Sequence, residues 1–369
     1  MQQLGAESQA DIGDFVKLFA VITVMIQSII SFLMQTSLPV GQQFLLGGIY
    51  EVVKFSASAF IFGILFSSTR THPMARLRDY PRFMINRWHI LFIPSILWTT
   101  VYLIFLPQLQ QHGHYHNLTS FGWQFINGNA APHLWYNVMM LQFIILMPIF
   151  WGLARWCTGK PQRGILIFSL TLAFELVWHW IYKLEIFHGP QAQQWYLFDR
   201  IFPSFIIFAV SGTLLWVFHE SICLFVMKHW GLLVTIWCLL LYYVTFNFFN
   251  YGTPVKLDNA PYYLPSMIFY NLASIGLIAT IAIYMQRFRS QWLPLVHWVA
   301  LYAHRAYLSH VFWLYWNWKL LAHWTIPLMI KFPLLIIMTI LLAFISAYGF
   351  HWLWSTFKYS FHFRHLING

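Results

Sequence analysis

Charged side chains are scarce in this sequence. Asp, Glu, Lys and Arg together make up 8% of the 369 residues, whereas hydrophobic residues make up 59% and aromatic residues 20%. A soluble domain carries about 25% charged residues, which keep its surface hydrated. The composition therefore excludes a water-soluble globular protein, and its many large apolar residues exclude an intrinsically disordered chain. Most of the outer surface is expected to face lipid.

Cysteine is also rare, with only Cys157, Cys223 and Cys238. Their spacing matches neither a disulfide framework nor a Cys-x-x-Cys metal site, so we interpret them as small apolar residues. The formal net charge of +11 does not indicate a nucleic-acid partner. The basic residues are confined to short gaps between long apolar runs, whereas nucleic-acid binding requires a basic face on a folded domain.

Long apolar runs recur along the whole chain. About 20 apolar residues are needed to cross the hydrocarbon core, and a helix satisfies its own backbone hydrogen bonds there. The sequence predicts an all-α, polytopic membrane helix bundle of about ten transmembrane helices, approximately at residues 15–34, 47–67, 88–106, 133–154, 164–182, 201–218, 230–249, 264–284, 300–320 and 332–354. Polar residues interrupt the ninth run, which its length and aromatic content still favour as a span.

Lys and Arg are distributed unequally between the two alternating sets of gaps. Thirteen lie in one set, namely Arg70, Arg76, Arg78, Arg82, Arg87, Arg155, Lys160, Arg163, Lys228, Arg287, Arg289, Lys358 and Arg364. The other set holds Lys183, Arg200, Lys256, Lys319 and Lys331. Because basic residues are retained on the cytoplasmic side, both termini are predicted to be cytoplasmic, with residues 1–14 as a short tail. That tail lacks the basic segment of a secretory signal, so the first span is expected to be retained.

The longest extracytoplasmic gap, residues 107–132, contains His112, His114 and His116. Alternating histidines can bind a metal ion. A solvated loop rich in Gly, Asn and Gln explains them without one, and no metal site is predicted.

Ionisable residues inside the predicted spans are candidates for function, because a charge in hydrocarbon is costly. Glu175 and His179 lie four residues apart on one helix face, either as a pair that neutralises itself or as a proton relay. Glu51 and Lys54 open the second span and are predicted to form an interfacial ion pair. The ninth span concentrates polar groups that packing against lipid does not require: His304, Arg305, Tyr307, Ser309 and His310.

The densest basic run precedes the third span and includes Arg82 and Arg87. Positive-inside topology explains this run. The alternative is a ligand site, because arginine forks bind phosphates bidentately and would hold a phosphorylated cytosolic donor such as a coenzyme.

Four motifs follow one another along the chain. They are the apolar run 55–63, which ends at a glycine; the basic run 82–94, which ends at a proline; His133-Leu-Trp-Tyr136 with Leu141 and Pro148 after it; and Tyr307-Leu-Ser-His310. In this order they resemble the acyltransferase-3 family of bacterial integral membrane proteins. The resemblance implies one integral membrane domain over residues 1–369 in the plasma membrane, which carries an acyl group from cytoplasmic acyl-coenzyme A to a sugar outside.

The first span departs from the family pattern. The family carries an arginine there and, after ten intervening residues, a catalytic histidine, whereas this chain has Lys17 and Ser28, with Gln27 beside the latter. An amide does not titrate, and a serine needs a base of its own. The candidate catalytic residues are therefore His310 or the pair of Glu175 and His179.

The resemblance leads us to expect an acyl-CoA-dependent O-acyltransferase, with acetyl-CoA as the foremost cosubstrate, that acts on a surface polysaccharide or lipid-linked glycan. Arg82 and Arg87 are the expected cofactor-binding residues. The expected substrate-binding residues are Trp135, Tyr307 and Arg305. The alternative is a non-catalytic transporter or export partner of a glycan synthase on the same scaffold, because Trp and Tyr faces stack on sugar rings. Membrane lipids are the remaining expected partners.

Overall fold

The computed structural model describes residues 10–73, 75–322 and 324–367, with side chains of the last segment described only as far as Leu353. Most of the predicted N-terminal tail, and the side chains of Lys358 and Arg364, thus lie outside the described part. Within these ranges the chain forms fourteen α-helices and no strand.

The α-helices follow one another through short loops, apart from the longer connections between α5 and α6, between α9 and α10 and between α11 and α12. Their bounds are α1 Ile12–Leu33, α2 Val40–Val52, α3 Ser56–Thr71, α4 Tyr80–Arg87, α5 Ile93–Phe105, α6 Leu118–Asn127, α7 Leu134–Ile145, α8 Met147–Cys157, α9 Pro161–Ile181, α10 Ile206–Val217, α11 His219–Phe249, α12 Pro265–Arg287, α13 Leu293–Ala322 and α14 Leu328–Ile367. The π-helical turn Trp88–Phe92 joins α4 to α5.

Each of the ten predicted apolar runs coincides with one or two of these helices. Seven helical segments of the described residues are long and apolar enough to cross a membrane, and an eighth is added if the bent pair α7 and α8 is one span. The apolar stretch that contains α10 is shorter, and α13, which holds the predicted ninth span, is not among these segments. The all-α membrane bundle is therefore confirmed, whereas ten as the number of spans and the cytoplasmic location of both termini stay predictions.

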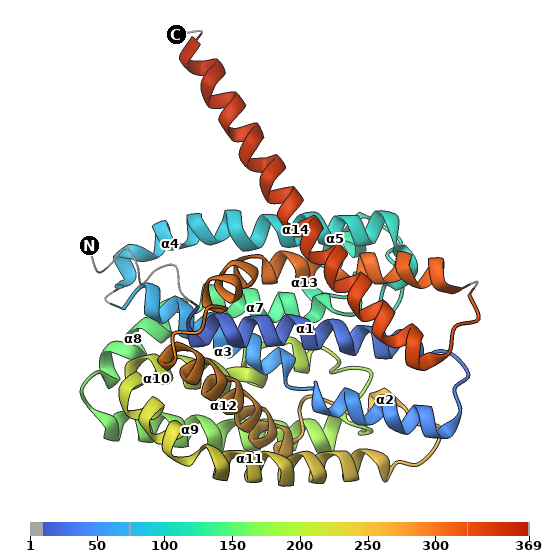
Figure 1. The fold of residues 1–369 in the computed structure, drawn as a ribbon, viewed down its shortest axis with the longest axis horizontal. Helices are drawn as coiled ribbons and strands as arrows, with labels where there is room; N and C mark the ends of the chain where they lie inside the picture. Colours follow the sequence, from blue (N-terminus) through green and yellow to red (C-terminus); the bar gives the residue numbers. More distant parts are fainter. Residues whose placement is uncertain (1–9, 74, 323, 368–369) are drawn as a thin grey trace.

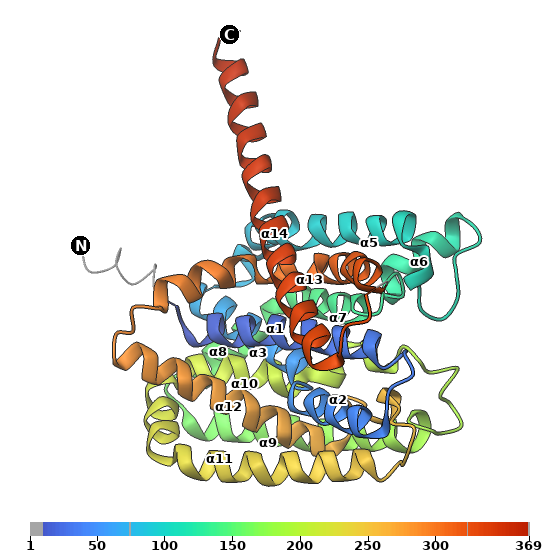
Figure 2. The same cartoon turned by 45° about the vertical axis from the view of Figure 1, so that its right-hand side comes forward.

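Helix α1 lies in the middle of the bundle and packs against α3, α12 and α13 (Figure 1). Its N-terminus is closed by a capping box, in which the Asp11 side chain accepts from the Asp14 backbone N–H at 2.7 Å. Asp11 pairs with Arg70 of α3 at 2.6 Å, and Asp14 contacts His297 of α13 at 2.7 Å. Two neighbouring helices thus fix the end of α1. The C-terminal part of α14, in contrast, projects beyond the bundle in both views (Figures 1 and 2).

Two predicted spans are broken instead of continuous. The second is interrupted at residues 53–55, between α2 and α3. The fourth bends by 55° between α7 and α8, where Pro148 lacks the backbone N–H that a continuous helix needs. Apolar periodicity does not report such breaks. In lipid the backbone groups that a break releases need other partners, so each break marks a place where side chains must reach the backbone.

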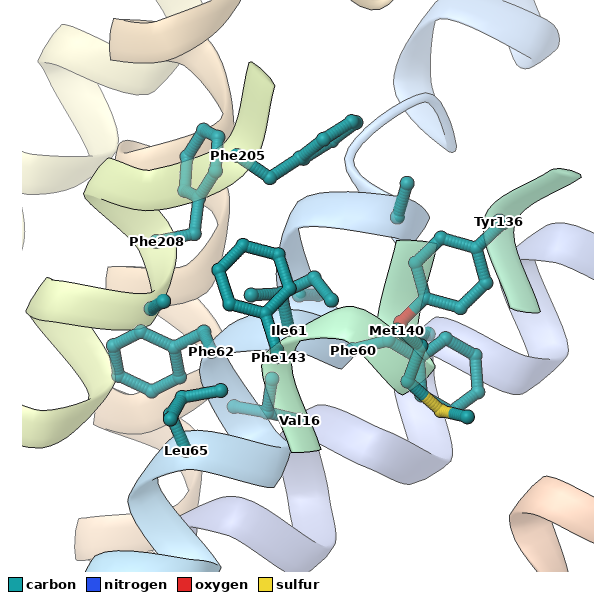
Figure 3. Packing of buried hydrophobic residues seen from close by; sticks show 14 of the residues in the cluster. Val16, Phe60, Ile61, Phe62, Leu65, Tyr136, Met140, Phe143, Phe205 and Phe208 are labelled. Atoms are coloured by element: carbon teal, nitrogen blue, oxygen red, sulfur yellow. The ribbon is translucent and has the colours of Figure 1, made fainter. Parts of the chain in front are cut away.

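Aromatic side chains of α3, α7 and the start of α10 fill the space beside α1 (Figure 3). The rings of Phe62 and Phe208 lie at one end of this cluster and those of Phe60 and Tyr136 at the other. The last two rings are 5.6 Å apart between centroids, and both also line the cavity described next. The cluster therefore forms a rigid floor beneath that cavity.

Candidate functional site

A cavity of about 620 Å³ lies between α1, α3, α7 and α13. Its rim is formed by the end of α1 and by loop residues, among them Gln35, Gln111 and residues 254–258. All three loops belong to the gaps that the basic-residue count predicts to be extracytoplasmic. The volume lies within the roughly 300–1,000 Å³ that is usual for small-molecule sites.

Ser28 and His310 meet at the wall of this cavity. Ser28 lines it, and its Oγ lies 3.0 Å from the Nε2 of His310, which is itself fully buried. The other ring nitrogen, Nδ1, lies 2.5 Å from the backbone oxygen of Tyr307. A carbonyl oxygen only accepts, so Nδ1 carries the proton and Nε2 is left as an acceptor facing the serine hydroxyl. The serine that replaces the family's histidine thus has a base beside it.

Buried tyrosines hold the His310 segment in place. Tyr307 donates its hydroxyl to the backbone oxygen of His133, whose ring lies 4.7 Å from that of His310. Tyr102 of α5 donates to the oxygen of Leu308 at 2.9 Å and accepts from the N–H of Phe312 at 3.0 Å. Its hydroxyl is therefore inserted between two backbone groups of α13, one on each side of His310 in sequence.

The break between α2 and α3 forms another part of the cavity wall. Gln27 donates to the freed oxygen of Val53 at 2.5 Å, and Tyr270 donates to that of Val52 at 2.8 Å. Tyr262, in the loop before α12, donates to the side-chain oxygen of Gln27. Burial raises the pKa of the Tyr262 phenol to about 12, so this hydroxyl remains a neutral donor at physiological pH. Gln27 therefore connects the broken backbone to the rim loop.

Lys54 lies at this same break and is 2% exposed. Its Nζ donates to the hydroxyl of Tyr50 at 3.0 Å and lies 4.2 Å from the ring centroids of both Tyr50 and Tyr262. Glu51 is equally buried. The salt bridges of the described residues include none between Lys54 and Glu51, so the predicted ion pair is not formed by direct contact. Its location at the membrane interface stays a prediction. The aromatic rings around Lys54 attract its ammonium group.

Glu175 and His179 are 0% and 1% exposed, which agrees with the expectation that ionisable groups in a span point into the bundle. Their side chains are 3.8 Å apart. Glu175 accepts from the backbone N–H of Ile207 at 2.6 Å, in the first turn of α10, and His179 lies 3.2 Å from the oxygen of Ser204. The acceptor oxygen of Glu175 satisfies a backbone N–H that has no partner within α10. These contacts attach α9 to the start of α10, and neither residue lines the cavity.

Of the remaining predicted site residues, two line the cavity and three do not. Trp135 and Tyr307 both line the cavity, whereas Arg305 is half-buried on α13 and does not. Arg82 is exposed on α4, and Arg87 stacks over the Phe83 ring with its guanidinium carbon 4.9 Å from the centroid. Neither arginine lines the cavity or a second one of about 390 Å³.

The second cavity lies on the side predicted to be cytoplasmic. It is lined by Thr69, Pro73, Arg155 and Thr158, together with apolar residues of α8 and α10. Arg155 donates to the backbone oxygen of Ala75. The described residues thus form a hollow at each predicted membrane face.

Sequence reasoning did not assign a role to Ser28, His133 or Tyr102. A signal existed for the first two, because Ser28 stands at the position of the family's histidine and His133 belongs to one of the four motifs. Tyr102 carried no signal, because one tyrosine in an aromatic-rich span is indistinguishable from its neighbours. Among the described residues no cluster of three or more His, Cys, Asp or Glu side chains could hold a metal ion.

One model of a known protein family matches nearly the whole chain. A family model described as an acyltransferase domain matches residues 14–348, from the capping box of α1 into α14. No curated protein and no solved structure shows significant similarity. The match includes all four motifs and both cavities. The chain therefore belongs to the acyltransferase-3 family of multi-pass membrane acyltransferases.

Proposed function

We propose that this protein transfers an acyl group, acetyl in the first instance, from cytoplasmic acyl-CoA to a hydroxyl group of a surface polysaccharide or lipid-linked glycan outside a bacterial plasma membrane. One observation carries the proposal: the Nε2 acceptor of buried His310, 3.0 Å from a hydroxyl that lines the cavity. A neutral imidazole with its second nitrogen held by a carbonyl is suited to general-base catalysis of acyl transfer.

The cavity at the predicted outer face would receive the acceptor. Its wall presents the aromatic side chains of Trp135, Tyr136 and Tyr307 together with the polar groups of Gln27 and Ser31. Aromatic faces with a few polar groups among them are suited to sugar rings, which have apolar faces and hydroxyl edges. This composition supports a glycan acceptor.

The coenzyme would bind from the opposite side. Arg82 and Arg87 lie on α4, at the predicted cytoplasmic face, and Arg155 lines the hollow of that face. Arginine binds phosphate oxygens bidentately, so these three residues are the proposed contacts of the coenzyme phosphates. The thioester would then enter the bundle toward Ser28 and His310.

The test is binding of acetyl-CoA, succinyl-CoA and palmitoyl-CoA to the purified full-length chain in lipid vesicles. Arg82→Ala, Arg87→Ala and Arg155→Ala each remove a charge-assisted hydrogen bond worth about 1.5–3 kcal/mol, so the affinity is expected to fall roughly 10- to 150-fold in at least one variant. Lys228→Ala is the matched control, because this exposed lysine lies at the same predicted face outside the proposed site.

Unchanged affinity in all three variants would contradict the proposed donor site. Absence of binding for all three acyl-CoA probes in the parent protein would contradict the acyltransferase proposal and leave a transporter or export partner as the better reading.

A further inference from the structure

We propose that Ser28 is the nucleophile of this transferase and that its Oγ carries the acyl group between donor and acceptor. The inference rests on the proposed function and adds a covalent intermediate to it. It depends on the position of the Ser28 hydroxyl relative to the His310 imidazole and to the cavity.

Ser28 has the surroundings of an activated nucleophile. Its Oγ is within hydrogen-bond distance of two acceptors, the Nε2 of His310 and the backbone oxygen of Val24, both at 3.0 Å. The serine has one proton, and only the histidine can take it up. Because the Nδ1 proton is held by the oxygen of Tyr307, a neutral ring cannot present an N–H to the serine without losing that 2.5 Å bond. The arrangement of nucleophile, base and orienting acceptor is the one that serine-based acyl transfer requires.

His310 is buried, whereas Ser28 is accessible from the cavity, as a base and a nucleophile respectively require. His310 is 0% exposed, so water does not compete for its Nε2. Ser28 is half-buried and lines the cavity, so its oxygen can meet a substrate. A serine hydroxyl that only satisfied the helix backbone would need neither the histidine nor the open space.

The two half-reactions balance without any further reagent. In the first, the Ser28 Oγ attacks the thioester carbon, the carbon–sulfur bond breaks, and the serine proton passes through His310 Nε2 to the departing thiolate, which leaves as the free thiol. In the second, an acceptor hydroxyl attacks the acyl-serine ester and gives its proton to Nε2. The carbon–Oγ bond breaks, and the same proton returns to Ser28.

A covalent carrier also fits the position of Ser28 between the two faces. At 1.5 Å per residue it lies about 24 Å along α1 from Ile12, near the end of the helix that borders the outer cavity. A donor and an acceptor that arrive from opposite sides of a membrane need not occupy the site together if the acyl group waits on the protein. Direct transfer with Ser28 as a mere support for the His310 ring is the competing mechanism.

The experiment uses the full-length protein in vesicles with acyl-labelled acetyl-CoA, succinyl-CoA or palmitoyl-CoA and no acceptor. We expect release of about one equivalent of coenzyme and label on the protein that resists acid and is removed by hydroxylamine. Peptide mass spectrometry should locate it at Ser28. Ser28→Ala should abolish the label and lower turnover by more than about 1,000-fold, as removal of a covalent nucleophile does elsewhere.

Two further variants exclude an effect of misfolding. Thr23→Val removes another hydroxyl from α1, one that bonds only to the backbone and does not line the cavity, and should keep both label and turnover. Ser28→Cys retains a nucleophile, and its adduct should become a thioester. Turnover without label in the parent, or full turnover in Ser28→Ala, would overturn the inference while the acyltransferase proposal stands. Binding of acyl-CoA with neither coenzyme release nor label would likewise overturn the inference alone, because direct transfer releases coenzyme only when an acceptor is present. Absence of binding for all three probes would overturn both.

Discussion

The Oγ of Ser28 and the Nε2 of His310 lie 3.0 Å apart although 282 residues separate them in the chain. Helices α1 and α13 pack directly on each other, and contacts of Asp14 with His297 also join them at the other end of α1. Ser28 stands where the family resemblance leads us to expect a histidine, and a histidine from another helix lies beside it. This relationship leads to the predictions below.

Replacement of Tyr102 by Phe should lower the rate of acyl transfer on the order of 10- to 100-fold while acyl-CoA affinity stays unchanged. The Tyr102 hydroxyl is inserted between Leu308 and Phe312, so its loss lets this turn of α13 close and moves His310 relative to Ser28. The check is kcat and the donor dissociation constant in parallel. Tyr80→Phe, which loses a hydroxyl-to-carbonyl bond at an exposed site, serves as control. A fall in donor affinity alone would show that Tyr102 does not act through His310.

Lys54→Met should lower the unfolding temperature, and the further change Glu51→Gln should restore most of it. Both side chains are 2% exposed, and the charge of Lys54 acts on the Glu51 carboxyl without a direct contact, so removal of one leaves the other buried without this compensation. The double-mutant cycle in detergent is expected to give a coupling energy of about 0.5–3 kcal/mol. Additive effects of the two changes would mean that the charges do not depend on each other.

Gly212→Ala should destabilise the protein by about 1–3 kcal/mol, because the added Cβ would lie 2.4 Å from the backbone oxygen of Phe62 and force α10 away from α3. Gly231→Ala is the matched control on α11. Nothing lies within 4 Å of its added Cβ, so it should be neutral or stabilising through helix propensity. Thermal unfolding of both variants checks this, and equal unfolding temperatures would contradict the close helix contact.

Topology is tested by reporter fusions after Asn117 and after Arg289. The basic-residue count predicts that the first reporter is extracytoplasmic and the second cytoplasmic. The proposed sides of donor and acceptor depend on this result. The opposite pattern would place the larger cavity on the cytoplasmic face and remove the assignment of that cavity to the glycan.

Much of the fold was predictable because it follows from local composition. The ten apolar runs coincide with helices since each run satisfies its own backbone in lipid, and the Glu175–His179 contact follows from their spacing of four residues. The breaks at residues 53–55 and at Leu146 were not predictable. Apolar residues continue through the second, and Lys54 at the first is equally compatible with the start of a span. The groups that stabilise the first break, Gln27 and Tyr270, come from distant helices.

The candidate site was predictable only in part. His310, Trp135 and Tyr307 could be named because they belong to two of the four motifs. Ser28 and His133 carried a signal but no assigned role, and Tyr102 carried none, because the contacts of all three with the His310 segment are long-range in sequence. A lone serine or tyrosine in an apolar run has no local feature that distinguishes a site residue from one that bonds to its own helix.

The most direct test of the account is the rate of acyl transfer by His310→Gln compared with the parent, with donor affinity measured on the same samples. Glutamine fills a similar volume but cannot accept and return a proton, so a loss of about 10²–10⁴-fold in rate with unchanged acyl-CoA affinity is predicted. His219→Gln, a half-buried histidine of α11 outside both cavities, should keep the parent rate. Parent-like transfer by His310→Gln would contradict the central claim that His310 is the base of this site.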